Sequence, residues 1–128
     1  MKEFIKLCDL DIALYQCVTP MIRSEEVIIT DERIEHIKER HPNDFERYAS
    51  YIIEMIRHPQ YILQSDMPHT AFILKSFCDN GTHFQLILRL AVPPDTSGYK
   101  NSVITFLRIS TRTWNKYLRN KKILYKSD

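Results

Sequence analysis

The densest group of residues suited to chemistry lies in segment 33–42, which contains two histidines and two arginines. At about 100° per residue on a helix, Arg33, His36 and Arg40 fall on one flank. The two guanidinium groups disfavour a second positive charge on His36, which suits its imidazole to act as a general base. The helix dipole favours His41, at the expected C-terminus, as a protonated acid. Alternatively, His36 is a solvated surface residue and His41 only caps carbonyl groups.

Polar side chains within predicted strands add a second group. A charge in a strand interior is often only the solvated face of a sheet. Strict alternation in strand 102–109 predicts that Thr105 shares a face with Val103, and that Ser102 shares the other face with Phe106. The second group consists of Lys75 in strand 70–77, Arg89 in strand 82–92, and Ser102 and Thr105 in strand 102–109.

These residue types together are sufficient for RNA cleavage without a metal. The reaction needs a base for the 2′-hydroxyl, an acid for the leaving 5′-oxygen, and cations or hydroxyl donors around the phosphorus. No paired-carboxylate pattern, cysteine nucleophile motif or glycine-rich phosphate loop is evident, so we expect neither a metal nor a cofactor. The candidate catalytic residues are His36, His41, Lys75, Arg89, Ser102 and Thr105.

The charge is distributed unevenly along the chain. Residues 1–99 carry ten Lys/Arg and fifteen Asp/Glu, whereas residues 100–128 carry eight Lys/Arg and one Asp. A basic end suits a phosphate-binding face, although a solvated tail would look the same. Tyr99, Trp114 or Tyr117 is a candidate to stack a base, with core packing favoured for Trp114. The candidate substrate-binding residues are Arg33, Arg40, Arg108, Arg112 and Lys116.

Periodicity predicts helices first and strands afterwards. One helix is expected from Thr30, a good N-cap before two acidic residues, to about His41, where Pro42 ends it. A second is expected from 44 to about 58, because apolar residues recur every three or four positions. Strands are expected at 61–64, 70–77, 82–92 and 102–109, with Asn80-Gly81 as a hairpin signal. Weaker signals predict strands at 3–8, 27–29 and 123–125 and a short helix at 111–118. The expected fold is α+β, with N-terminal helices packed on a mostly antiparallel sheet of four strands or slightly more.

Length and composition favour a single intracellular domain. The 128 residues are enough to bury a hydrophobic core without stabilisation by disulfides or metal ions. Residues 1–26 are expected to form an N-terminal extension of uncertain structure. The three cysteines lack a zinc or disulfide spacing pattern. No signal peptide or membrane-spanning stretch is evident, which predicts a cytoplasmic protein without a membrane partner.

The run at 29–42, ITDERIEHIKERHP, resembles the opening of the phage-associated nucleases of the barnase–EndoU–colicin–RelE superfamily. Three later features fit the same resemblance: His58-Pro59 before Gln60-Tyr61-Ile62, the lysine in the next strand, and Ser102-Val103-Ile104-Thr105. It covers roughly residues 27–126. It implies an α+β fold and a phosphodiesterase site built from a helix histidine, a basic residue and a strand Ser/Thr. The matching positions are His36, Arg40, His41, Lys75, Arg89, Ser102 and Thr105, with either histidine as the catalyst.

Two functions remain open at this point. The first is a metal-independent endoribonuclease of the phage- or mobile-element-borne toxin type, acting on tRNA or other RNA. The second is a catalytically silent accessory module of the same fold that binds nucleic acid or protein. The resemblance also implies an immunity or antitoxin protein, or a phage structural protein, as a partner. Clustering of the candidate residues in one cleft would favour the enzyme.

Overall fold

The computed structural model describes residues 3–40, 45–77, 81–93, 95 and 98–127. His41 and the residues Cys78 to Asn80 of the expected hairpin therefore lie outside the described residues. The helices and strands follow the predicted order closely. They are β1 (Phe4–Asp9), α1 (Ile12–Tyr15), β2 (Glu26–Thr30), α2 (Asp31–Arg40), α3 (Phe45–Arg57), β3 (Tyr61–Gln64), β4 (Thr70–Phe77), β5 (Thr82–Arg89), β6 (Asn101–Ile109), α4 (Thr111–Asn120) and β7 (Ile123–Lys126).

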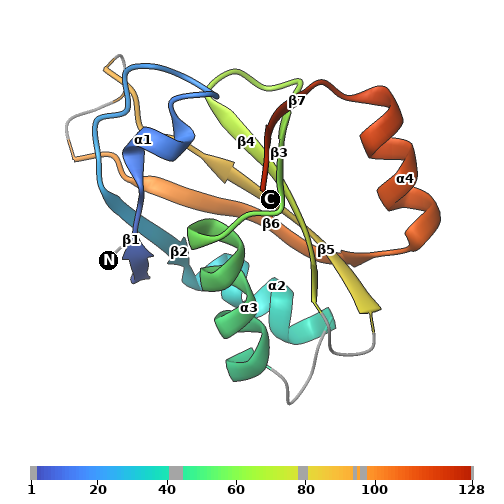
Figure 1. The fold of residues 1–128 in the computed structure, drawn as a ribbon. Coiled ribbons are helices and arrows are strands. Elements are labelled where there is room, and N and C mark those ends of the chain that lie inside the picture. Colours follow the sequence, from blue (N-terminus) through green and yellow to red (C-terminus); the bar gives the residue numbers. More distant parts are fainter. Residues whose placement is uncertain (1–2, 41–44, 78–80, 94, 96–97, 128) are drawn as a thin grey trace.

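The sheet is larger than the four strands, or slightly more, that the sequence predicted. In the described part of the chain it contains seven strands in the order β1-β2-β6-β5-β4-β3-β7 (Figure 1). The pairs are antiparallel except for β2 with β6, which run parallel. The weak strand signals near both ends of the chain all become sheet strands. Short segments of this kind are hard to place from sequence because their neighbours come from distant parts of the chain.

The expectation that the helices are N-terminal is only partly correct. The first three helices precede the central strands, but α4 follows β6 (Figure 1). On β4, Ile73 belongs to the core cluster that includes α3, whereas the adjacent Leu74 belongs to the cluster that includes Trp114 of α4. Because neighbouring side chains of a strand point to opposite faces, α3 and α4 cover opposite faces of the sheet.

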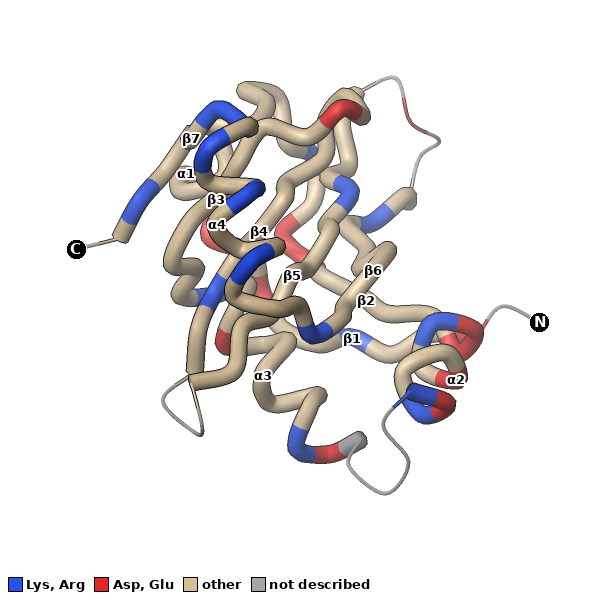
Figure 2. Tube along the Cα trace, turned by 90° about the vertical axis from the view of Figure 1, so that its right-hand side faces the viewer, with Lys and Arg blue, Asp and Glu red and all other residues tan. Residues whose placement is uncertain are grey.

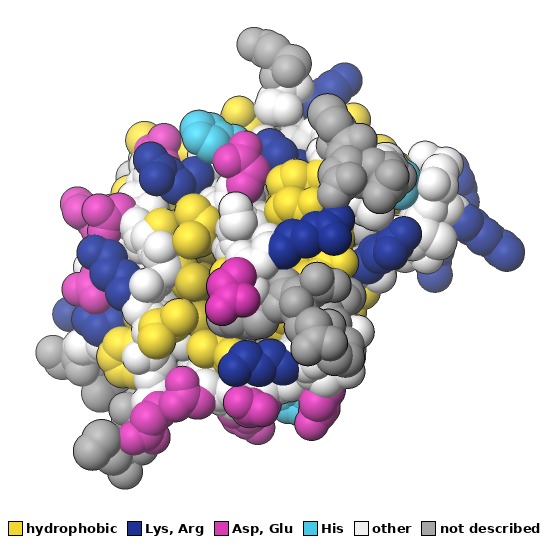
Figure 3. Space-filling model, turned by 90° about the horizontal axis from the view of Figure 1, so that it is seen from below, with side chains coloured by type: hydrophobic (Ala, Val, Ile, Leu, Met, Phe, Trp, Pro, Cys, Tyr) yellow, Lys and Arg dark blue, Asp and Glu magenta, His cyan; other side chains and the backbone are white. Residues whose placement is uncertain are grey.

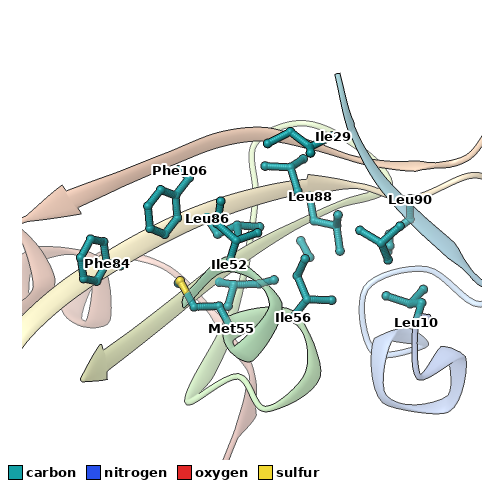
Figure 4. Close-up of a cluster of buried hydrophobic side chains, with 14 of the residues drawn as sticks. Leu10, Ile29, Ile52, Met55, Ile56, Phe84, Leu86, Leu88, Leu90 and Phe106 are labelled. Atoms are coloured by element: carbon teal, nitrogen blue, oxygen red, sulfur yellow. The ribbon is translucent and has the colours of Figure 1, made fainter. Parts of the chain in front are cut away.

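The main core lies between α3 and the apolar face of β5. Figure 4 shows Ile52, Met55 and Ile56 of α3 packed beneath Leu86 and Leu88. All five side chains are essentially inaccessible to solvent, at 0% or 1% exposure. Truncating one such aliphatic side chain to alanine costs about 2–5 kcal/mol of unfolding free energy. This core rigidly positions the strands that carry the candidate residues.

A β-bulge changes the faces expected in β6. Ile87 lies opposite Thr105 and Leu88 lies opposite Val103, so one extra residue is inserted in β6 between them. Directly opposed residues share a face, so Val103 faces the core with Leu88 while Thr105 faces the other side with Ile87. The expectation of strict alternation was therefore wrong: Ser102, opposite Arg89, shares a face with Thr105. Phe106 and Val103 are both buried core residues.

Candidate active site

The candidate site forms where β2 ends its pairing with β6. The register of β2 with β6 comprises Val27 opposite Asn101 and Ile28 opposite Ser102. After Thr30 the chain turns into α2, whose first turn is capped because the Thr30 hydroxyl accepts a hydrogen bond of 3.3 Å from the Arg33 amide. The helix therefore lies beside the edge of β6 that β2 no longer covers.

A small pocket lies between α2 and this edge of β6. Its volume is about 190 Å³. Pockets for complete small molecules usually measure about 300–1,000 Å³, so this one fits a single group of a longer substrate better. The pocket is lined by Arg33, His36, Ile37, Arg40, Val103, Ile104, Thr105 and Phe106.

Helical spacing explains why three polar side chains of α2 share this pocket. Ile34 and Ile37 are buried and anchor the helix to the sheet. That anchoring turns Arg33, His36 and Arg40 to the adjoining flank, as the sequence predicted. His36 and Arg40 are exposed, and Arg33 is half-buried. Among the residues that the structure describes, neither guanidinium group forms an ion pair.

The arrangement has the elements of a phosphodiester site. An imidazole accepts or donates a proton near neutral pH. Two guanidinium groups match the geometry of phosphate oxygens. Thr105 also lines the pocket, although its side chain lies on the face of β6 opposite the core. The structure thus brings His36, Arg33, Arg40 and Thr105 together, from α2 and β6.

Lys75 lies elsewhere, on the face of the sheet that α3 covers. Its ammonium group donates a hydrogen bond to the carbonyl oxygen of His58, just past the end of α3. It also lies 3.5 Å from a carboxylate oxygen of Glu54. A cation at a helix C-terminus satisfies free carbonyl groups and the negative end of the helix dipole. Lys75 does not line the α2–β6 pocket.

Arg89 also lies outside the pocket, at the end of β5. Its guanidinium group binds both carboxylate oxygens of Asp95, at 3.0 and 3.3 Å. The amide of Val92 donates to the same carboxylate at 2.8 Å. The Val92 amide, followed by the Arg89 guanidinium group, holds the pKa of Asp95 below its usual value. Ser102, opposite Arg89, likewise does not line the pocket.

The three basic candidates near the C-terminus lie on two elements. Arg108 shares a face of β6 with Phe106 and lies about 7 Å farther along the strand. Arg112 and Lys116 are exposed on α4. Figure 2 shows Lys and Arg residues along α4 and the segment after it. In the part of the chain that the structure describes, these three side chains form no ion pairs.

The underside of the molecule, where α2 and α3 lie, carries charges of both signs. Figure 3 shows acidic and basic side chains interspersed around a strip of hydrophobic ones on this face. Uniform attraction of a polyanion to this whole face is therefore not expected. The cations of the α2–β6 pocket act locally, whereas α4 provides the more uniformly basic surface.

Two polar residues that the sequence analysis did not single out organise the molecule. His83 bonds to the hydroxyl groups of Ser76 and Thr111 and stacks on Trp114, with ring centroids 4.8 Å apart. Trp114 is buried, which confirms its expected core packing. Asn101 is fully buried and bonds to the backbone of Ser24, Glu26 and Ala91. No signal in the sequence indicated this role, because Asn101 was expected to lie in the loop before strand 102–109.

The chain was compared with known families and proteins. A family model described as phage-Barnase-EndoU-ColicinE5/D-RelE like nuclease 2 matches residues 4–126. No curated protein matches the chain, and no solved structure does. None of the helices within the described ranges is long and apolar enough to cross a membrane.

Proposed function

The chain belongs to the family of phage-Barnase-EndoU-ColicinE5/D-RelE like nucleases, and from this premise we propose that it is a metal-independent endoribonuclease. The observation that carries the proposal is the α2–β6 pocket, in which His36 lies with Thr105 and two arginines that form no ion pair within the described residues. A nuclease site must combine a proton-transfer group with fixed cations, and this pocket combines them.

In the proposed reaction, the RNA 2′-oxygen attacks the adjacent phosphorus. His36 takes the 2′-hydroxyl proton, the bond from phosphorus to the 5′-oxygen breaks, and that oxygen receives a proton. The products are a 2′,3′-cyclic phosphate and a 5′-hydroxyl. The proton donor proposed from the sequence, His41, lies outside the described residues. Arg33 and Arg40 stabilise the negative charge on the phosphorus oxygens, and the proposed role of Thr105 is limited to lining the pocket.

The substrate is proposed to be RNA held partly outside the pocket. Arg108, Arg112 and Lys116 are available to phosphates because they form no ion pairs within the described residues. Neutralising phosphates releases counterions from the nucleic acid, which supplies sequence-independent affinity. A tRNA or another structured RNA is the expected substrate, and cytoplasmic toxin activity with an immunity or antitoxin partner is part of the same proposal. That part rests on family resemblance.

The deciding experiment is cleavage of total RNA in EDTA by the wild-type protein, His36→Ala and His58→Ala. His58 is a matched control, because it is an exposed histidine outside the α2–β6 pocket. We expect cleavage ending in 2′,3′-cyclic phosphate, lost by about 10²–10⁴-fold in His36→Ala and retained in His58→Ala. Equal cleavage by His36→Ala and the wild type would refute the role of His36.

The second candidate function is a catalytically silent module that binds nucleic acid or protein. One observation favours it: Lys75 and Arg89, two of the expected catalytic cations, are engaged by Glu54 and Asp95. In that case the wild-type protein binds RNA tightly but yields no cyclic-phosphate product in EDTA. The same assay therefore separates the two functions.

A further inference from the structure

Tyr99 presents an exposed aromatic ring in a basic environment. Its side chain is 41% exposed, whereas Trp114 is buried at 8% and Tyr117 packs edge-on against Phe72 with ring centroids 4.9 Å apart. Of the three aromatic residues that the sequence suggested for base stacking, Tyr99 is thus the one with a free ring surface. Phe4 has a similar exposed fraction, 39%, but lies on the edge strand β1.

The ring of Tyr99 contacts the side chain of Arg89. The guanidinium carbon of Arg89 lies 5.5 Å from the ring centroid, within the range of a cation–π contact. Arg89 is itself fixed by the two-point ion pair with Asp95. Because the Arg89 guanidinium group is fixed, it holds the Tyr99 ring in one orientation. Less conformational entropy is then lost when a ligand stacks on the ring.

Tyr99 also lines a pocket of about 130 Å³, together with Arg23, Asp95 and Lys100. This volume is close to the roughly 150 Å³ cavity that accommodates a benzene ring in another protein, so a single-ring base fits. The wall is rigid because the buried Asn101 side chain joins the backbone at Ser24 to that at Ala91.

A cation suited to a nucleotide phosphate lies in the same pocket. The guanidinium group of Arg23 donates to the carbonyl oxygens of Pro93 and Asp95, at 3.1 and 3.4 Å. Within the described ranges it forms no ion pair, so its charge is not neutralised by a carboxylate. Lys100 differs, because its ammonium group lies 3.4 Å from Glu26.

We propose that this pocket binds an unpaired nucleobase, stacked on Tyr99, of a single-stranded RNA segment. The proposal deepens the proposed nuclease function, on which the identity of the ligand as RNA rests. Tyr99 and Val103 of the α2–β6 pocket are four residues apart, about 13 Å along an extended chain. That distance corresponds to roughly four stacked nucleotides of one strand, so one RNA segment can reach both pockets.

The test measures RNA affinity in a His36→Ala background, where cleavage does not interfere. A fluorescent 12-nucleotide oligouridine and the same strand annealed to oligoadenosine are titrated at one salt concentration. The variants are Tyr99→Ala, Tyr99→Leu and Tyr99→Phe, with Phe4→Ala as the matched exposed aromatic. Thermal unfolding of each variant verifies that it is folded.

We expect Tyr99→Ala and Tyr99→Leu to weaken single-strand binding about five- to 140-fold, which is the loss of one base stack converted at 1.4 kcal/mol per tenfold. In Tyr99→Phe and Phe4→Ala, single-strand affinity should stay within about twofold of the His36→Ala parent. Affinity for the duplex should be unchanged by every Tyr99 substitution. Unchanged single-strand affinity in Tyr99→Ala and Tyr99→Leu, equal losses for the duplex, or no binding of the oligouridine would overturn the proposal.

The outcome is separable from that of the nuclease proposal. Cleavage of total RNA that depends on His36, combined with no effect of Tyr99, leaves the nuclease and removes the base pocket. Absence of cleavage, combined with the predicted loss in Tyr99→Ala, leaves a base-binding pocket on a silent module.

Discussion

Cationic side chains in this molecule fall into two groups that differ in their partners. Lys75 and Arg89 are engaged by Glu54 and Asp95, and their side chains are only 19% and 25% exposed. Arg33, Arg40 and the basic residues Arg112 and Lys116 of α4 form no ion pairs in the part of the chain that the structure describes. All of these cations were candidate site residues in the sequence analysis.

The difference has a physical consequence for function. A partly buried cation that already binds a carboxylate must break that pair before it binds a phosphate, leaving the carboxylate uncompensated. An unpaired surface cation has no such cost and is available to the substrate. A basic residue therefore indicates a phosphate site only after its partners in the folded protein are known.

The largest effect should come from the cations of the α2–β6 pocket. In Arg33→Ala/Arg40→Ala we expect the single-turnover rate of RNA cleavage to fall about 10²–10³-fold or more, because charge stabilisation at the phosphorus is removed. The unfolding free energy should change by only about 0.5 kcal/mol, since these are surface positions. Urea unfolding measures the latter. Arg57→Ala on α3 is the matched control, and a comparable loss of rate in it would contradict the assignment.

The next effect concerns the cations of α4. In Arg112→Ala/Lys116→Ala, the slope of log affinity against log salt should become less steep by roughly 1.4–1.8, or about 0.7–0.9 for each phosphate that the protein no longer neutralises. This slope is measured by fluorescence titration of RNA at salt concentrations from about 50 to about 200 mM. Lys6→Ala is the control, because Lys6 lies 2.8 Å from Asp9 on β1. An unchanged slope would exclude α4 from the RNA-binding surface.

A smaller effect is expected from a paired cation. Lys75→Met removes the hydrogen bond to the His58 carbonyl group and should cost about 1 kcal/mol of unfolding free energy. Cleavage by the folded protein should stay within about threefold of the wild type, because Lys75 does not line the pocket. A Lys75→Met variant that is stable but inactive would place Lys75 in the catalytic site. It would also contradict the proposal that only the unpaired cations act on the substrate.

The smallest effect is the pH dependence of the Arg89–Asp95 pair. The pKa of Asp95 is lowered in the folded state, so its stabilising contribution is present above the unfolded-state value of about 3.9 and is lost as the pH falls below it. Asp95→Asn should therefore be less stable than the wild type at pH 7, and the difference should shrink at pH 3. Urea midpoints at both pH values measure this. A difference that persists at pH 3 would show that the Asp95 charge is not its source.

Much of the secondary structure was predictable because its causes are local. The apolar stripe of α3, with Ile52, Met55 and Ile56, follows from helical periodicity alone. The pairing of Phe77 with Thr82 confirms the hairpin that the Asn80-Gly81 signal predicted, with Gly81 at a φ of 60°. The size of the sheet was underestimated, because β1 and β7 find their neighbours through contacts distant in sequence.

The candidate site also has a part that local sequence patterns predicted and a part that depends on tertiary structure. The sequence by itself determined that Arg33, His36 and Arg40 share one flank, because residues separated by three, four or seven positions on a helix lie on the same side. Only the tertiary structure decided that Thr105 lines the same pocket, because α2 lies beside the part of β6 that no longer pairs with β2. The bulge in β6 then decided that the Thr105 side chain lies on the opposite face from Val103. It likewise decided that Lys75 and Arg89 bind Glu54 and Asp95, because the partner of a charge depends on packing between elements that no local pattern specifies.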